Sequence, residues 1–135
     1  MTKTEIMDAL KEKATPYSSF SIDESTAKAM TSLPNPFDLV EPILELIGTH
    51  PTVDFGMPGD LVHFVEHFYN HGYEELLMAS VAHTPTAHNI WMLHRCYNNP
   101  KDPKRKQYKA LVNELMTNDS IPEEIKREIQ GYTWE

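Results

Sequence analysis

The sequence has 135 residues, ten of them proline, and a formal net charge of −8. This length fits one domain over residues 1–135, which needs no disulfide, and the negative charge argues against nucleic acid, whose phosphates would be repelled. No segment approaches the ~20 apolar residues of a membrane span, and residues 1–15 lack a signal-peptide run, so we expect a cytoplasmic protein without membrane contact.

Apolar residues at helical spacing predict a first helix over residues 4–14 and a weaker second helix over residues 23–31. A third predicted helix, residues 37–47, contains Pro42, which must kink the helix or start it afresh because proline lacks an N–H donor. Asp60 is expected to cap a fourth helix. The predicted core stripe of this helix is Leu61, Phe64, Val65 and Phe68.

Four further helices are predicted in the second half of the chain. The fifth covers residues 73–81, and Thr84-Pro85 forms a cap and first-position pair for the sixth. Asp102-Pro103 repeats this start signal for the seventh helix, and Ile121-Pro122 begins the last. Each pair combines a residue that ends the preceding connection with a proline that fits the first turn of a helix.

The pattern of the whole chain indicates an all-α fold. No segment alternates polar and apolar residues with the period of a strand, and no repeat of the length found in solenoid arrays is evident. Short connections between consecutive helices favour antiparallel packing. We therefore predict a compact bundle of about seven or eight short helices, packed as antiparallel hairpins.

Charge is distributed unevenly along the chain. Residues 1–75 carry 13 acidic and 4 basic side chains, a net −9, whereas residues 76–135 carry 7 and 8, a net +1. The 66 residues between Lys28 and Arg95 contain no Lys or Arg but all seven histidines, so the negative field should weaken as pH falls toward ~6. A negative surface can merely maintain solubility, but it can also recognise a basic partner. The predicted partner-binding residues are Asp38, Glu41, Glu45, Asp54, Asp60, Glu66, Glu74 and Glu75.

His63, Glu66 and His67 form an H-x-x-E-H pattern, which occurs in one class of zinc peptidases. On a helix the two histidines share a face, but a catalytic zinc also needs a third protein ligand and a substrate cleft. The histidines equally fit the solvent edge of an amphipathic helix. We expect no metal, no cofactor and no enzymatic activity, and we keep a small metal-binding protein or hydrolase using these three residues as the alternative.

Two other features have simpler interpretations. Cys96 lies among apolar residues and is interpreted as a small core residue rather than a nucleophile. Five basic residues between Lys101 and Lys109 are interpreted as a solvated face, or as partners of acidic residues elsewhere in the fold.

The run from Asp54 to His63, together with Glu66, resembles a signature of small helical immunity proteins of contact-dependent growth inhibition and related polymorphic toxin systems. Pro85-Thr86 followed by Trp91 to Arg95 extends this resemblance, which spans about residues 37–130. Two positions depart from the pattern: Asp60 stands where a proline is expected, and His94 where an asparagine is expected.

This resemblance implies a protein that is made beside a toxin, binds the toxic C-terminal domain and blocks its active site. Many of these toxins are nucleases, and an acidic inhibitor can occupy the basic groove of a nuclease in place of phosphates. The expected partner is therefore a basic toxin domain, in particular a nuclease. A generic helical adaptor is a further possibility, and it predicts an exposed apolar groove rather than a charged face.

Overall fold

The computed structural model describes all of residues 1–135 and contains eight α-helices and one short 3-10 helix. No strand forms, and the only backbone pairing of strand type is an isolated bridge between Ser19 and Asp54. The predicted all-α fold is therefore confirmed. The helices are α1 (Lys3–Lys13), α2 (Glu24–Ser32), η1 (Pro36–Leu39), α3 (Val40–Thr49), α4 (Asp60–Glu66), α5 (Tyr73–His83), α6 (Ala87–Tyr97), α7 (Arg105–Thr117) and α8 (Glu123–Gln130).

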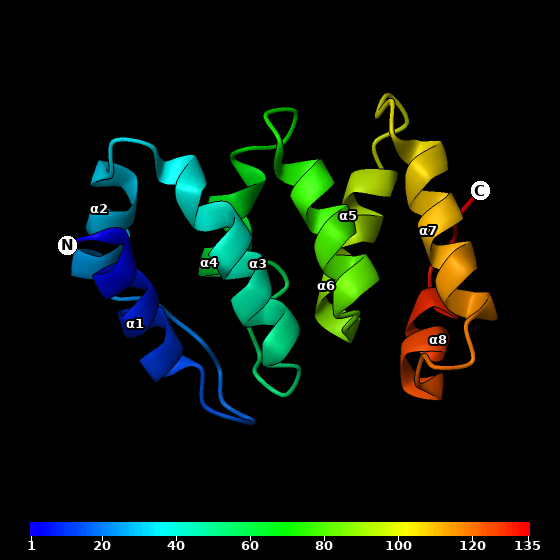
Figure 1. Cartoon of the computed structure of the whole chain (residues 1–135), viewed down its shortest axis with the longest axis horizontal. Helices are drawn as coiled ribbons and strands as arrows, with labels where there is room; N and C mark the ends of the chain where they lie inside the picture. Colours follow the sequence, from blue (N-terminus) through cyan, green and yellow to red (C-terminus); the bar gives the residue numbers. More distant parts are fainter.

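Four consecutive helical hairpins stand side by side in a row, with the chain termini at opposite ends (Figure 1). Each odd-numbered helix packs on the helix that follows it, which gives the pairs α1–α2, α3–α4, α5–α6 and α7–α8. Helix α3 also packs on α1 and α5, and α5 packs on α7, so the odd-numbered helices form one layer. The even-numbered helices form the second layer, in which α6 packs on α8.

One continuous apolar core holds the row together, and 30 buried residues from every hairpin contribute to it. Helix α3 shows how the sequence directs this packing. Ile43, Leu44 and Ile47 follow each other at the spacing of one helix face and are buried, whereas Glu41 and Glu45 are exposed. Because the helices are short, burial of these faces rather than intrinsic helix propensity stabilises them.

Pro42 lies in the first turn of α3, where a backbone N–H has no partner within the helix. Of the two alternatives for the third helix, the structure shows the restart: η1 ends at Leu39 and α3 begins at Val40. Longest of all the helices is α7, with 13 residues. No helix combines the length and the apolar character needed to cross a membrane.

The predicted helix starts are wrong at three places. Gly59, not Asp60, is the N-cap of α4, and Thr86, two residues after Thr84, is the N-cap of α6. Lys104 precedes α7, while Asp102 lies two residues further back. Asp60 and Asp102 accept hydrogen bonds from other groups of the fold. Thr84 is followed closely by Thr86, which is the stronger cap.

The predicted core stripe of α4 is also only partly correct. Leu61 and Val65 are buried, together with Val62, which was not predicted. Helix α4 ends at Glu66, so Phe68 lies beyond it. Phe64 and Phe68 are partly buried and pack edge to face on each other, with ring centroids 5.7 Å apart. They line a depression between α2 and α4.

Candidate functional site

The structure divides the eight predicted partner-binding residues into three groups. Three are exposed and form no salt bridge: Asp38, Glu41 and Glu45. Three have polar partners within the fold: Glu66, Glu74 and Glu75. The remaining two are Asp54 and Asp60. Asp54 accepts a hydrogen bond within the α3–α4 connection, and Asp60 accepts one from the α1–α2 connection.

Asp38, Glu41 and Glu45 form what we call the acidic row. Their spacing of three and four residues places them along one side of η1 and α3. The side-chain amide of Asn35 donates a hydrogen bond to Asp38 over 3.2 Å, and no Lys or Arg pairs with any of the three carboxylates. Like charges at this spacing destabilise a helix slightly, so the acidic row is not explained by helix stability.

A groove of about 450 Å³ lies between α3 and α5, beside Glu41 and Glu45. Its apolar lining comes from Leu44, Leu76 and Ala79, and no Lys or Arg contributes to it. A lysine or arginine side chain combines an apolar stem with a charged end. The groove offers apolar contact for such a stem and the two carboxylates for the charged end.

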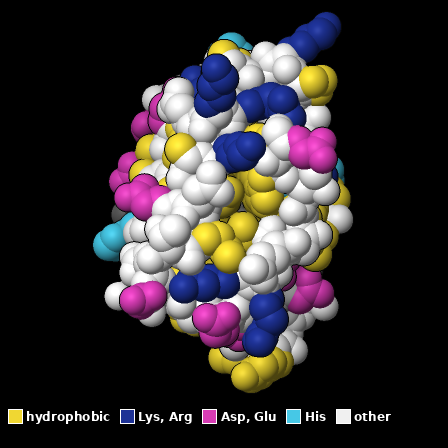
Figure 2. All heavy atoms as spheres, turned by 90° about the vertical axis from the view of Figure 1, so that its right-hand side faces the viewer, with side chains coloured by type: hydrophobic (Ala, Val, Ile, Leu, Met, Phe, Trp, Pro, Cys, Tyr) yellow, Lys and Arg dark blue, Asp and Glu magenta, His cyan; other side chains and the backbone are white.

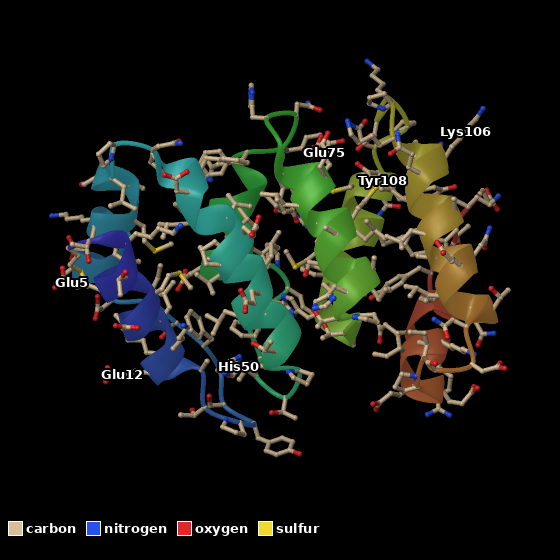
Figure 3. All side chains as sticks on the ribbon, viewed as in Figure 1. Glu5, Glu12, His50, Glu75, Lys106 and Tyr108 are labelled. Carbon is tan, nitrogen blue, oxygen red and sulfur yellow. The ribbon has the colours of Figure 1, made fainter.

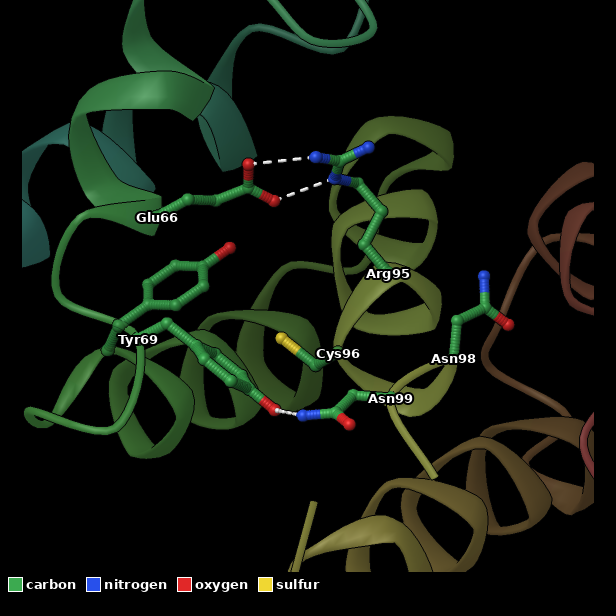
Figure 4. Close-up of a pocket in the computed structure, with 7 residues that line it drawn as sticks. Glu66, Tyr69, Arg95, Cys96, Asn98 and Asn99 are labelled. Carbon is green, nitrogen blue, oxygen red and sulfur yellow. Dashed lines mark hydrogen bonds and ion pairs between the residues drawn. The ribbon is translucent and has the colours of Figure 1, made fainter. Parts of the chain in front are cut away.

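Glu66 and Arg95 form a bidentate ion pair between α4 and α6 (Figure 4). The Nε and Nη2 atoms of Arg95 donate to the two carboxylate oxygens of Glu66 over 2.7 and 3.0 Å. The guanidinium also lies 5.0 Å from the ring centroid of Trp91. The hydrogen bonds with Glu66 raise the pKa of Arg95. Glu66 thus connects two hairpins of the fold.

Glu74 and Glu75 differ in exposure although they are neighbours. Glu74 is buried, and its carboxylate accepts a hydrogen bond from the backbone N–H of Asn70 over 2.9 Å. Glu75 lies at the start of α5 (Figure 3) and pairs with Lys104 over 3.1 Å. Its own backbone N–H and then Lys104 lower the pKa of the Glu75 carboxyl. Both side chains therefore have partners within the fold.

Asp54 and Asp60 hold connecting segments in place. Asp54 accepts a hydrogen bond from the N–H of Gly56 over 2.9 Å, and its backbone pairs with Ser18 and Phe20. Asp60 accepts from the N–H of Ile22 over 3.0 Å, which explains why it does not cap α4. Both carboxylates are exposed, but each accepts a backbone hydrogen bond that stabilises a connecting segment.

The alternative metal site on His63, Glu66 and His67 receives no support from the geometry. The carboxylate of Glu66 is paired with Arg95, and Nδ1 of His67 lies 2.7 Å from the carbonyl oxygen of His63. No group of three or more His, Cys, Asp or Glu side chains is arranged to hold a metal ion. Both histidines are exposed: His63 lies on α4, and His67 directly follows it.

A cavity of about 440 Å³ opens beside the Glu66–Arg95 pair. Burial raises the pKa of the Cys96 thiol in its lining well above the usual range, which disfavours the thiolate form at neutral pH. The cavity is lined by Glu66, Tyr69, Tyr73, Arg95, Cys96, Asn98 and Asn99.

Behind this cavity lies a polar cluster that the sequence interpretation missed. Asp102 is buried and accepts hydrogen bonds from the hydroxyls of Tyr69 and Tyr108, and from the N–H of Lys104 over 2.8 Å. Tyr108 extends from α7 toward the neighbouring hairpin (Figure 3). Burial, followed by the hydrogen bond with Asp102, raises the pKa of Tyr69 to about 12. The only sequence signal was the two tyrosines themselves, since buried hydroxyls need partners.

At the end of the row formed by α7 and α8, Lys and Arg side chains are interspersed with Asp and Glu around a hydrophobic patch (Figure 2). Lys104 pairs with Glu75, and the guanidinium of Arg105 lies 4.3 Å from the ring centroid of Tyr97. Lys101, Lys106 and Lys109 are exposed. Lys104 thus pairs with an acidic residue elsewhere in the fold, whereas the three exposed lysines form a solvated face.

Comparisons of the chain with known protein families, with curated proteins and with solved structures gave no match.

Proposed function

We propose that this chain is an immunity-type inhibitor, which binds a basic toxin domain, in particular a nuclease, through the acidic row and the groove beside it. The observation that carries this proposal is the row of three exposed carboxylates without a salt bridge, next to a groove without Lys or Arg. The sequence resemblance to immunity proteins points to the same class of partner.

The surface has the physical properties that such an inhibitor needs. Uncompensated carboxylates attract a basic partner over a distance and increase the rate of encounter. The groove then allows a lysine or arginine side chain of the partner to bury its apolar stem. Each exposed charge contributes only about 1 kcal/mol or less, so several residues must be changed together to test the surface.

The test is growth of cells that express the toxic C-terminal domain encoded beside this gene. We expect the unaltered chain to restore growth, and a variant carrying Asp38→Lys, Glu41→Lys and Glu45→Lys to lose protection at equal protein level. The matched control carries Glu12→Lys, Glu114→Lys and Asp119→Lys. These three residues are exposed, have no salt bridge and give the same change in net charge.

The control variant should protect as well as the unaltered chain. If the acidic-row variant also protects fully, the acidic row is not the binding surface. If the unaltered chain gives no protection against the toxic domain, the immunity function itself is wrong.

A further inference from the structure

Tyr17 is an exposed aromatic residue at a position of a turn where glycine is the favoured residue. Residues 15–18 form a turn in which the N–H of Ser18 donates to the carbonyl oxygen of Thr15 over 3.2 Å. Pro16 occupies the second position, and Tyr17 occupies the third with a φ of 60°. This is the pattern of a type II turn, whose third position requires positive φ and selects glycine or asparagine. A tyrosine there is strained.

The ring of Tyr17 does not pack in the core, so no buried contact offsets the backbone strain at this residue. Tyr17 as a residue is 87% exposed, the highest value among the exposed large hydrophobic residues. It therefore buries little apolar surface, and glycine or asparagine would fit the backbone better. Backbone strain combined with exposure of a large aromatic ring is characteristic of binding positions rather than of structural ones.

Hydrogen bonds hold the turn of residues 15–18 in place. The N–H of Tyr17 donates to the carbonyl oxygen of Thr52 over 2.9 Å, and the N–H of Asp54 donates to the carbonyl oxygen of Ser18 over 2.9 Å. Within the turn, the hydroxyl of Thr15 donates to the hydroxyl of Ser18 over 2.7 Å. The ring is thus presented from a fixed backbone, which reduces the entropy lost when a partner binds.

The turn that carries Tyr17 is hydrogen-bonded to the segment that follows α3. Helix α3, which carries Glu41 and Glu45, ends at Thr49 and leads directly to Thr52, the hydrogen-bond partner of Tyr17. In the view of Figure 1, the α1–α2 connection, which carries Tyr17, and the start of the α3–α4 connection lie together below α1 and α3. Met57, which is 60% exposed, lies on the same α3–α4 connection. Exposed carboxylates thus lie along α3, and exposed apolar side chains lie on the α1–α2 and α3–α4 connections.

We infer that Tyr17 is an anchor residue, which inserts its ring into an apolar pocket beside the basic surface of the partner. This inference rests on the proposed function and adds to it a chemical requirement on the partner: a basic surface that adjoins a pocket large enough for an aromatic ring. Tyrosine is enriched among the few interface residues that carry most of the binding energy, whereas the carboxylates mainly increase the rate of encounter.

Three substitutions separate the ring from the strain. Tyr17→Asn removes the ring and suits positive φ, so it should raise Tm by about 3 °C and weaken binding at least about tenfold. Tyr17→Ala should weaken binding equally without raising Tm, because alanine is strained at the same φ. Tyr17→Phe keeps the ring and should keep most of the affinity. The measurements are thermal unfolding of each variant and its Kd for the purified toxic domain.

Unchanged affinity of the Asn and Ala variants would overturn the anchor role, and a lower Tm of the Asn variant would overturn the strain on which it is based. If the unaltered chain does not bind the domain, the proposed function fails and the anchor loses its partner. Self-association of the unaltered chain in sedimentation velocity, lost in both variants, would assign the ring to a second copy and overturn the inference.

Discussion

Asp102 is a buried charged residue on which a hydrogen-bond network depends. It is 5% exposed and accepts hydrogen bonds from two tyrosine hydroxyls and one backbone N–H. The two hydroxyls come from Tyr69, which follows α4, and Tyr108 of α7, so the carboxylate connects different hairpins of the row. Removing one member of such a buried network leaves the others without partners.

We expect Asp102→Ala to lower the free energy of unfolding by about 2–4 kcal/mol. Urea denaturation followed by circular dichroism measures this change. Asp119→Ala is the matched control, because Asp119 is exposed, and its effect should stay within about 0.5 kcal/mol. Equal midpoints for the two variants would show that the Asp102 network does not stabilise the fold.

Residue-level sequence interpretation identified which residues are acidic but not which of them lack partners. Glu66 pairs with Arg95, and Glu75 pairs with Lys104, in both cases across 29 positions of the chain. Such pairs depend on how the hairpins pack, and no local pattern reveals them. The absence of Lys and Arg over 66 residues was visible in the sequence, whereas the acidic row required the structure.

At the scale of helices, α6 begins with a complete capping box. The hydroxyl of Thr86 accepts from the N–H of Asn89 over 3.0 Å, and the side chain of Asn89 accepts from the N–H of Thr86 over 2.8 Å. Asn89 also donates to the carbonyl oxygen of Thr84 over 2.9 Å. Both members of this capping box are buried.

We expect Thr86→Ala to destabilise the protein by about 1–2 kcal/mol, because it leaves a buried N–H without a partner. Thr2 caps α1 with the same reciprocal geometry but is exposed to water. Thr2→Ala should therefore cost about 0.5–1 kcal/mol. Urea denaturation of both variants gives the comparison, and a larger effect at Thr2 would contradict the importance of burial.

The positions of the helices could be predicted from the sequence because proline and the apolar spacing mark them clearly. Their exact starts could not, since Thr84 and Thr86 are both good caps and only Thr86 has Asn89 at the required distance. The short length of α4 was missed because the connection after it continues as a series of turns. Hydrophobic spacing alone therefore extended the helix to Phe68.

At the scale of the whole molecule, negative charge is concentrated in one part of the row of hairpins. The acidic row lies on the second hairpin and its leading 3-10 turn, in a stretch without Lys or Arg. Residues 95–135 carry eight basic and seven acidic side chains, and both kinds are interspersed at the end formed by α7 and α8 (Figure 2). A partner with a basic surface is therefore attracted more strongly to the second hairpin than to the nearly neutral end formed by α7 and α8. Such a field orients the encounter as well as accelerating it.

The central claim is that the acidic row directs association with a basic toxin domain. The most direct test is the association rate of the two proteins, measured by stopped-flow fluorescence as salt rises from about 50 to about 500 mM. We predict a fall of at least about tenfold for the unaltered chain, and a slow rate with little salt dependence for the triple variant Asp38→Lys, Glu41→Lys and Glu45→Lys. A rate that is indifferent both to salt and to these three reversals would contradict the account.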